Sequence, residues 1–472
     1  MSTVRRSEDP REAIPALAFC LPIVKLIRYD GDETQRESWT MARTRKDAAS
    51  EDHAGVNGRR SDPAADRAAL LTALDQAITR RHERMVRFRR RLHATPEPSN
   101  EEYASTALIA ETLREAGIDS RIMRGRTGVI CDIDLGAPAD SFIALRAELD
   151  CVRVNDDKQV PYASTRAGLC HACGHDVHST MVLSAGITLF EHVESIRPLE
   201  PRQNLRLIFQ PAEETATGAR SMIEQNAIDG VKAILALHVD PAFEPGTVGL
   251  RNGPLTAACK IFRIAIKGRS GHTARPFEAV DPIPAATNLI GLLYQLGPRS
   301  IDTRYPLAVT VASIKAGEAF NAIPDEAHIS GTIRCARVDD MQAVQNKLDM
   351  IVRGMKETIG CEITVEYPYA CPPTDNHPEL IGRLAQVGSE MLGPEHVHWI
   401  DVPSMGGEDF AFYQELIPGV LVRLGAALPD PRRRRPLHSS HFDIDETALA
   451  IGSRLLCRSV IDLVTNDVIP RT

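Results

Sequence analysis

Apolar and polar residues follow two different periods along this chain, and each period predicts a different kind of element. From residue 66 to about residue 93, apolar residues recur at helical spacing, which predicts a long first helix. Pro96 and Pro98 would end it, because a proline cannot donate the hydrogen bond that continues a helix. A second helix is predicted over 101–117, with Asn100 as its N-cap.

Short apolar runs then alternate with helical patterns as far as about residue 252. This alternation is typical of an α/β fold with a mostly parallel sheet and helices on both faces. Ligands of such a sheet bind beyond the carboxyl ends of its strands. The expected elements are a pair of strands over 127–135 and 141–149, a helix over 177–193, a strand over 205–210, a helix over 216–225 and a strand over 233–238.

After about residue 253 the order of the expected elements changes to β-α-β-β-α-β, which is the order of a ferredoxin-like α+β unit. We expect residues 253–370 to form an inserted domain of this kind. The catalytic domain would then be discontinuous, with parts over 66–252 and 371–472. The elements expected after residue 253 are strands over 258–267, 307–315, 326–336 and 362–367 and helices over 281–296, 338–359, 378–392 and 445–464.

Composition and charge narrow the class of protein. The 472 residues are long for one core, and 43% hydrophobic with 25% charged residues is typical of soluble globular domains. A net charge of −8 argues against a nucleic-acid binder. A membrane span needs about 20 apolar residues in a row, and no apolar stretch of this chain is that long. Ten cysteines at irregular spacing favour a reducing compartment, so we expect a cytoplasmic protein.

Two stretches do not fit this pattern of elements. Residues 1–65 are predicted to be a disordered extension, and a secretion signal over 13–27 is the weaker alternative. The run Arg432-Arg433-Arg434-Arg435 is strongly basic. It fits a solvated loop, and the alternative is a role in binding an anion.

Candidate metal ligands gather in residues 170–178, which hold two cysteines, three histidines and an aspartate. Thiolate, imidazole and carboxylate groups are the side chains that bind transition metals. Glu213 and Glu214 follow an apolar run, His238 ends another, and His438 lies far downstream. Metal ligands at several strand ends, together with a Glu-Glu pair, indicate a hydrolase with a two-metal site.

Other interpretations of these residues are weaker. Cys170-x-x-Cys173 alone fits a redox pair or half of a structural zinc site, but no second pair at similar spacing exists. A nucleobase deaminase would need a proline before the first cysteine, where Leu169 stands, and a His-x-Glu upstream. Packing of buried histidines and an acid-rich helix start at Glu213-Glu214 also remain possible. The downstream histidines favour the metal site.

Eleven short segments over residues 80–460 carry a family resemblance. They include His171-Ala172-Cys173-Gly174-His175-Asp176, Gln210-Pro211-Ala212-Glu213-Glu214 and Leu437-His438-Ser439. In these segments, and in their order, the chain resembles the M20 metallopeptidase family. The resemblance is to its amidohydrolase branch, which includes hippurate hydrolases, N-acyl-amino-acid amidohydrolases and auxin-conjugate hydrolases.

The resemblance implies two divalent metal ions, zinc or manganese, with cobalt or nickel as in vitro substitutes. Glu213 would be the general base, and His272, often acting in the partner subunit's site, would polarise the scissile carbonyl. Asn321 and Arg334 would hold the substrate, and Asp150 would support the ligands from behind. His441 remains an alternative to His438. The implied metal ligands are Cys173, His175, Glu214, His238 and His438.

These residues predict metal-dependent hydrolysis of the amide bond of N-acyl amino acids or related small carboxylated conjugates, by a metal-activated water. A carboxypeptidase or dipeptidase on the same scaffold is the close alternative. A non-catalytic metal-binding or assembly protein is the remote one, although such a relative should have lost a ligand or Glu213. We expect a homodimer formed through the inserted domain, which would also act as a lid.

Overall fold

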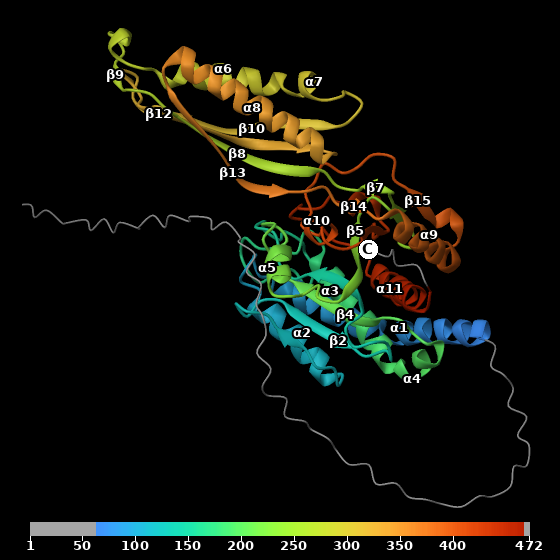
Figure 1. Cartoon of the computed structure of the whole chain (residues 1–472). Coiled ribbons are helices and arrows are strands. Elements are labelled where there is room, and N and C mark those ends of the chain that lie inside the picture. Colours follow the sequence, from blue (N-terminus) through green and yellow to red (C-terminus); the bar gives the residue numbers. More distant parts are fainter. Residues whose placement is uncertain (1–62, 467–472) are drawn as a thin grey trace, which may run out of the picture. The chain divides into compact units, whose positions relative to one another are not determined.

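The computed structural model describes residues 63–466, and Figure 1 shows how their elements are arranged. The predictions of a disordered extension and of a secretion signal lie outside these residues, except that residues 63–65 already belong to helix α1 (Pro63–Ala94). Within the described range, no helix is long and apolar enough to cross a membrane.

The larger sheet has eight strands in the order β1-β2-β4-β3-β5-β16-β6-β15. Its centre, β4-β3-β5-β16, is parallel, which confirms the predicted α/β class. The outer pairs β1-β2, β2-β4 and β16-β6 are antiparallel. The bounds are β1 Arg121–Ile122, β2 Val129–Ile133, β3 Phe142–Glu148, β4 Asn204–Gln210, β5 Val231–Asp240, β6 Val248–Leu250, β15 Val397–Trp399 and β16 Gly419–Gly425.

The expectation that the strands over 127–135 and 141–149 form a pair is wrong, because they correspond to β2 and β3, and β4 lies between these two strands. Both β3 and β4 are buried along their whole length, so each needs a strand on either side and helices on both faces. By contrast, β2 exposes Asp132 and lies nearer the edge of the sheet. The order of strands therefore follows burial and not sequence proximity.

Helices cover both faces of the larger sheet. Along β3, Leu145 packs into a core shared with α1, α3 and α11, and its neighbour Ala144 packs into a second core shared with α5 and α10. Alternate side chains of a strand reach opposite faces, so both faces are apolar. The bounds are α2 Tyr103–Glu115, α3 His175–Glu191, α5 Gly218–Glu224, α9 Pro378–Leu392, α10 Ala411–Gln414 and α11 Thr447–Thr465.

The start of α2 differs from the prediction. The N-cap position is held by Glu102 and not by Asn100, which has a φ of 68° in the turn before the helix. The Asn100 N–H donates to Oε1 of Glu102 at 2.9 Å. The same oxygen accepts from the N–H of Ala212 at 2.8 Å, so this carboxylate joins the helix start to the turn after β4.

The segment after residue 257 forms a separate four-stranded antiparallel sheet, in the order β10-β12-β8-β13. Its elements follow the predicted β-α-β-β-α-β order, and Figure 1 shows α6 and α8 together on one face. A ribbon of β9 (Gly271–His272) and β11 (Ala322–Ile323) is attached to it. The bounds are β8 Ala258–Lys267, α6 Pro282–Gln295, β10 Leu307–Ala316, β12 Glu326–Cys335, α8 Val338–Ile359 and β13 Glu362–Cys371.

Candidate metal centre

The cysteine- and histidine-rich segment forms the loop before α3 and the first turn of that helix. Cys173 precedes the N-cap Gly174, and His175 begins the helix. Gly174 has a φ of 87°, and a Cβ at this position would lie 2.4 Å from Cγ2 of Val239. The left-handed backbone and the close approach of β5 both require glycine here. This turn lets the Cys173 thiol and the His175 imidazole reach one cluster.

The other predicted ligands stand where further segments meet the same edge of the sheet. Glu213 and Glu214 follow β4, and His238 lies near the carboxyl end of β5. His438 lies in the loop before α11, and its N–H donates to the carbonyl of Ala172 at 2.8 Å. His438 has a φ of 65°, which is uncommon for a residue with a side chain and is found often at functional sites.

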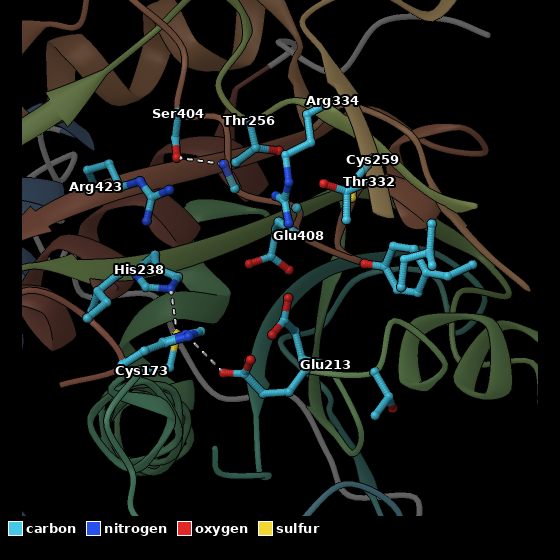
Figure 2. Close-up of a pocket in the computed structure, with 18 residues that line it drawn as sticks. Cys173, Glu213, His238, Thr256, Cys259, Thr332, Arg334, Ser404, Glu408 and Arg423 are labelled. Carbon is cyan, nitrogen blue, oxygen red and sulfur yellow. Dashed lines mark hydrogen bonds and ion pairs between the residues drawn. The ribbon is translucent and has the colours of Figure 1, made fainter. Parts of the chain in front are cut away.

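The ligand atoms of these residues lie close together, and Figure 2 shows Cys173 beside His238. The Cys173 Sγ is 3.5 Å from Nε2 of His238, and Nε2 of His438 is 3.5 Å from Oε1 of Glu214. Nε2 of His175 lies 3.8 Å from a carboxylate oxygen of each of Glu213 and Glu214. Several overlapping groups of three of these atoms lie within 4.8 Å of one another, including Cys173-His175-His238 and Cys173-Glu214-His438. Two ions that share ligands would fit this spacing.

The electrostatics of the cluster also fit a bound cation. Oε1 of Glu214 is buried and accepts no hydrogen bond. Burial raises the pKa of Glu213 and of Glu214, and the facing Glu408 raises that of Glu213 further. Burial opposes charge on His175, yet the thiolate of Cys173 and the carboxylate of Asp150 outweigh it and raise the pKa of the imidazole. Burial thus disfavours the charged forms of these carboxylates, a bound cation would stabilise them, and thiolate with imidazole suits a transition metal.

Asp150 stands directly behind these side chains. Nδ1 of His175 lies 3.1 Å from Oδ1 of Asp150, which fixes the ring so that Nε2 faces the cluster. The other carboxylate oxygen accepts from the hydroxyl of Ser99 at 2.7 Å and from the N–H of Glu214 at 3.0 Å. Asp150 thus supports two predicted ligands at once.

His178 has a role that the sequence did not reveal. Its Nδ1 lies 2.7 Å from Oε2 of Glu148, and its Nε2 accepts from the N–H of Val239 at 2.9 Å. Both ring nitrogens are therefore used within the protein, and His178 holds the end of β5 that carries His238. The signal in the sequence is its position three residues after His175, on the same face of a helix.

Arg146 is a second residue that the sequence analysis missed. It is fully buried in β3, forms an ion pair with Glu148, and lies 2.7 Å from Asp409 and 3.1 Å from Glu408. Burial alone would raise the pKa of Glu148, but Arg146 and His178 hold this pKa well below its usual value. Two charged residues inside an otherwise apolar strand were the available signal, because such charges are buried only when they are paired.

A cavity of about 740 Å³ opens over the cluster. Cys173, Glu213 and His238 line one side of it, and Arg334 of β12 and Tyr369 of β13 line the other. Figure 2 shows the carboxylates of Glu213 and Glu408 facing each other in the cavity. Nη1 of Arg334 donates to the carbonyl of Met405 at 2.7 Å, which positions the guanidinium.

The profile of the peptidase family M20/M25/M40 matches residues 144–462. The chain belongs to this family. N-acetyl-L-cysteine deacetylase of Bacillus subtilis is 34% identical over 386 residues, which are 82% of this chain and 89% of the relative. IAA-amino acid hydrolase ILR1-like 4 of Arabidopsis thaliana is 35% identical over 381 residues, 79% of this chain and 83% of the relative. The family resemblance is confirmed, and the chain is an M20 hydrolase.

A solved structure of the M20 family has the same fold. The crystal structure of the Bacillus subtilis YXEP protein is described as that of a dinuclear metal-binding peptidase from the M20 family. It superposes with a TM-score of 0.69 at 30% identity and covers 81% of this chain and 98% of that one. The clusters of histidine, cysteine and glutamate described above agree with metal binding in this M20 hydrolase.

Two residues predicted for catalysis and substrate binding lie elsewhere in this M20 hydrolase. His272 is on β9, where it pairs with Ala322 of β11, and Asn321 directly precedes β11. The N–H of Thr273 donates to the Asn321 carbonyl at 3.4 Å, so the two residues are neighbours. Neither lines the cavity over the metal cluster, unlike Arg334. The alternative ligand His441 lines a different cavity, which favours His438.

Proposed function

We propose that this M20 hydrolase cleaves the amide bond of N-acyl amino acids or related small carboxylated conjugates. The observation that carries the proposal is one cavity that joins metal-binding side chains, a carboxylate available as a base and an arginine. Zinc or manganese would be held by Cys173, His175, Glu214, His238 and His438. When bound, such ions lower the pKa of a water molecule and polarise the amide carbonyl.

Glu213 is the general base in this proposal. Its carboxylate is nearly buried, lies beside His175 and faces the cavity. Glu213 takes a proton from the attacking water and passes it to the leaving nitrogen as the C–N bond breaks, which leaves a carboxylic acid and an amine. Glu214, the adjacent residue, remains a ligand because adjacent side chains point in different directions.

Arg334 would bind the carboxylate of the substrate. One nitrogen of its guanidinium is anchored on Met405, and the others are left to point into the cavity. A guanidinium matches a carboxylate by its two parallel N–H groups, which gives geometric specificity as well as affinity. The names of the two relatives, N-acetyl-L-cysteine deacetylase and IAA-amino acid hydrolase, both describe substrates with an acylated amino acid.

We also propose that the four-stranded sheet unit acts as the lid and dimerisation domain. Its edge strand β10 has a free side, and edge strands invite pairing with another chain. Phe320, just before β11, is 99% exposed, and Phe277, in the turn Pro276–Glu278 after β9, is 82% exposed, which is unusual for phenylalanine. Contact with a partner subunit's cavity would cover these rings and bring His272 to a substrate. Location in the cytoplasm stays a prediction.

The test is a substrate panel with the purified protein loaded in turn with zinc, manganese, cobalt or nickel. N-acetyl and larger N-acyl amino acids should have the highest kcat/KM, and the matched substrates with a C-terminal amide should lose most of it. Faster turnover of dipeptides than of their N-acetylated counterparts would instead show a peptidase, as the description of the YXEP protein suggests. Absence of hydrolysis in protein that holds metal would favour the non-catalytic alternative.

A further inference from the structure

A second cavity, of about 500 Å³, lies outside the proposed catalytic machinery and is lined by basic side chains. Arg432, Arg433 and Arg435 come from the loop before His438, Lys158 comes from the loop after β3, and His441 comes from the turn before α11. The whole chain has a net charge of −8, whereas the lining of this cavity is mostly basic.

Within residues 63–466, one carboxylate, that of Asp443, lines the cavity, and it already has partners. Asp443 accepts from Arg89 at 3.2 Å and from the hydroxyl of Tyr162 at 2.8 Å, and neither donor lines the cavity. Arg89 also pairs with Asp176 and Glu446, so the charge of Asp443 is only partly compensated, and this single carboxylate faces three cavity arginines. Asp443 does not neutralise the basic wall.

Of the four lysine and arginine side chains in the lining, two are also paired and two are not. Lys158 lies 2.7 Å from Asp156, and Arg432 lies 3.1 Å from Asp430. Arg433 and Arg435 form no ion pair with any carboxylate among residues 63–466. The cavity thus presents two guanidinium groups that no described carboxylate holds in an ion pair, although Arg433 is near enough to Asp430 to lower the pKa of that carboxyl.

The arginine loop is anchored, which distinguishes it from a freely solvated run of charge. Nη1 of Arg435 donates to the carbonyls of Arg432 and Arg434 at 2.8 Å and 2.7 Å. Arg434 turns away from the cavity, donates to the carbonyl of Leu428 at 2.7 Å and pairs with Glu244 at 2.7 Å. The contacts of Arg434 attach the loop to the rest of the protein, and those of Arg435 fix the shape of the loop. Together they keep Arg433 and Arg435 at the cavity.

We propose that this basic cavity binds a small molecule that carries a phosphate group. The planar guanidinium forks of Arg433 and Arg435 match phosphate oxygens. The volume suits a small ligand and not a folded partner. This inference is independent of the proposed amide hydrolysis. The ligand would contact the segment between His438 and His441, so it would lie on the loop that also carries a proposed metal ligand.

Calorimetric titration of the metal-loaded protein at constant ionic strength tests the proposal, with inorganic phosphate and glycerol phosphate as probes. We expect saturable binding that weakens by about tenfold or more in Arg433→Ala/Arg435→Ala, because hydrogen bonds to a charged group contribute strongly. The matched control is Arg121→Ala/Arg124→Ala, which removes two exposed arginines near the far edge of the larger sheet and should bind like the wild type. Arg433→Gln/Arg435→Gln replaces the alanine variant if that one fails to fold.

The probes distinguish the two sources of phosphate. Tighter binding of glycerol phosphate would identify a phosphorylated metabolite, and equal affinities would identify free phosphate; both outcomes support the site. Unsaturable binding, or equal affinity in the cavity variant and the control, would overturn it, since phosphate held only at the metal centre would survive both pairs of substitutions. A single-stranded oligonucleotide that binds more tightly than either probe would overturn the small-molecule assignment.

Discussion

Two histidines of the proposed machinery lie in opposite surroundings. His175 at the metal centre is 1% exposed, and Asp150 fixes its ring from behind. His272 on the β9–β11 ribbon is exposed, and its Nδ1 accepts only from the N–H of Ala274, two residues away. A side chain held by buried partners is already positioned for chemistry, whereas an exposed one needs another surface to position it. The comparison separates a proposed metal centre whose side chains are held by buried partners from a proposed catalytic histidine that only its own turn holds among the described residues.

Removing a ligand from the metal centre should have the largest effect. Cys173→Ala takes away the thiolate that is common to two of the three-residue groups, so we expect the loss of both bound metal and activity. Metal analysis of the purified variant beside a kinetic assay measures both. Cys170→Ala is the matched control, because Cys170 is buried nearby beside Lys158 and should leave metal content near that of the wild type. Full metal occupancy in Cys173→Ala would contradict the ligand assignment.

Removing the base without removing a ligand should give the next largest effect. Glu213→Gln keeps the shape of the side chain, so bound metal should remain while kcat falls by about 10²–10⁴-fold. Metal content and kcat are measured on the same preparation. If metal is lost instead, Glu213 and Glu214 have exchanged roles. A variant that keeps more than about a tenth of wild-type kcat would show that Glu213 is not the base.

The exposed histidine is tested by mixing two inactive proteins. His272→Ala should lower kcat by about 10²–10³-fold if its imidazole stabilises the developing oxyanion. When His272→Ala and Glu213→Gln subunits exchange, each mixed dimer gains one site with neither defect, so activity should return if His272 acts in the partner subunit. Exchange is verified by native mass spectrometry. Verified exchange without recovery would place His272 in its own subunit's site, and a fully active monomer would remove the dimer proposal.

Weakening the support behind a ligand should have a smaller effect. Asp150→Asn removes the charge that orients His175 while Ser99 and the Glu214 N–H remain in place. Metal affinity should fall by about 10–100-fold, as is usual for groups that orient ligands. Competition with a fluorescent chelator measures it. Ser99→Ala is the milder control, and an affinity loss as large as that of Asp150→Asn would assign the effect to general loosening of the loop.

The sequence predicted the gathering of the metal-binding side chains because parallel strands end at one edge of a sheet. Cys173, Glu214 and His238 each belong to a segment beside such an end, so the position of each along its own segment was enough. The pairing of Arg146 with Asp409 could not be predicted in this way, because 263 residues separate them and only the packed fold brings them together. The insertion of β4 between β2 and β3 is non-local for the same reason. The position of Glu408 opposite Glu213 depends on the Arg146–Asp409 pairing and on the place of β4 in the sheet.

Removing the N-terminal residues should have the smallest effect. Every proposed ligand, the base and the substrate-binding arginine lie between residues 63 and 466, and the chain from Ser61 onward clusters as one compact unit. Helix α1 begins at Pro63, so a chain that starts at Ser61 keeps it whole, whereas the start near Asp66 suggested by the sequence would cut its first turn. Leu70 and Leu74 of this helix pack in the core with α3, whose first residue is His175.

We therefore expect wild-type kcat and thermal stability from the Ser61 chain and a lower melting temperature from a chain that starts at Leu74. Reduced activity of the Ser61 chain, with its metal content unchanged, would show that residues 1–60 contribute to catalysis or assembly.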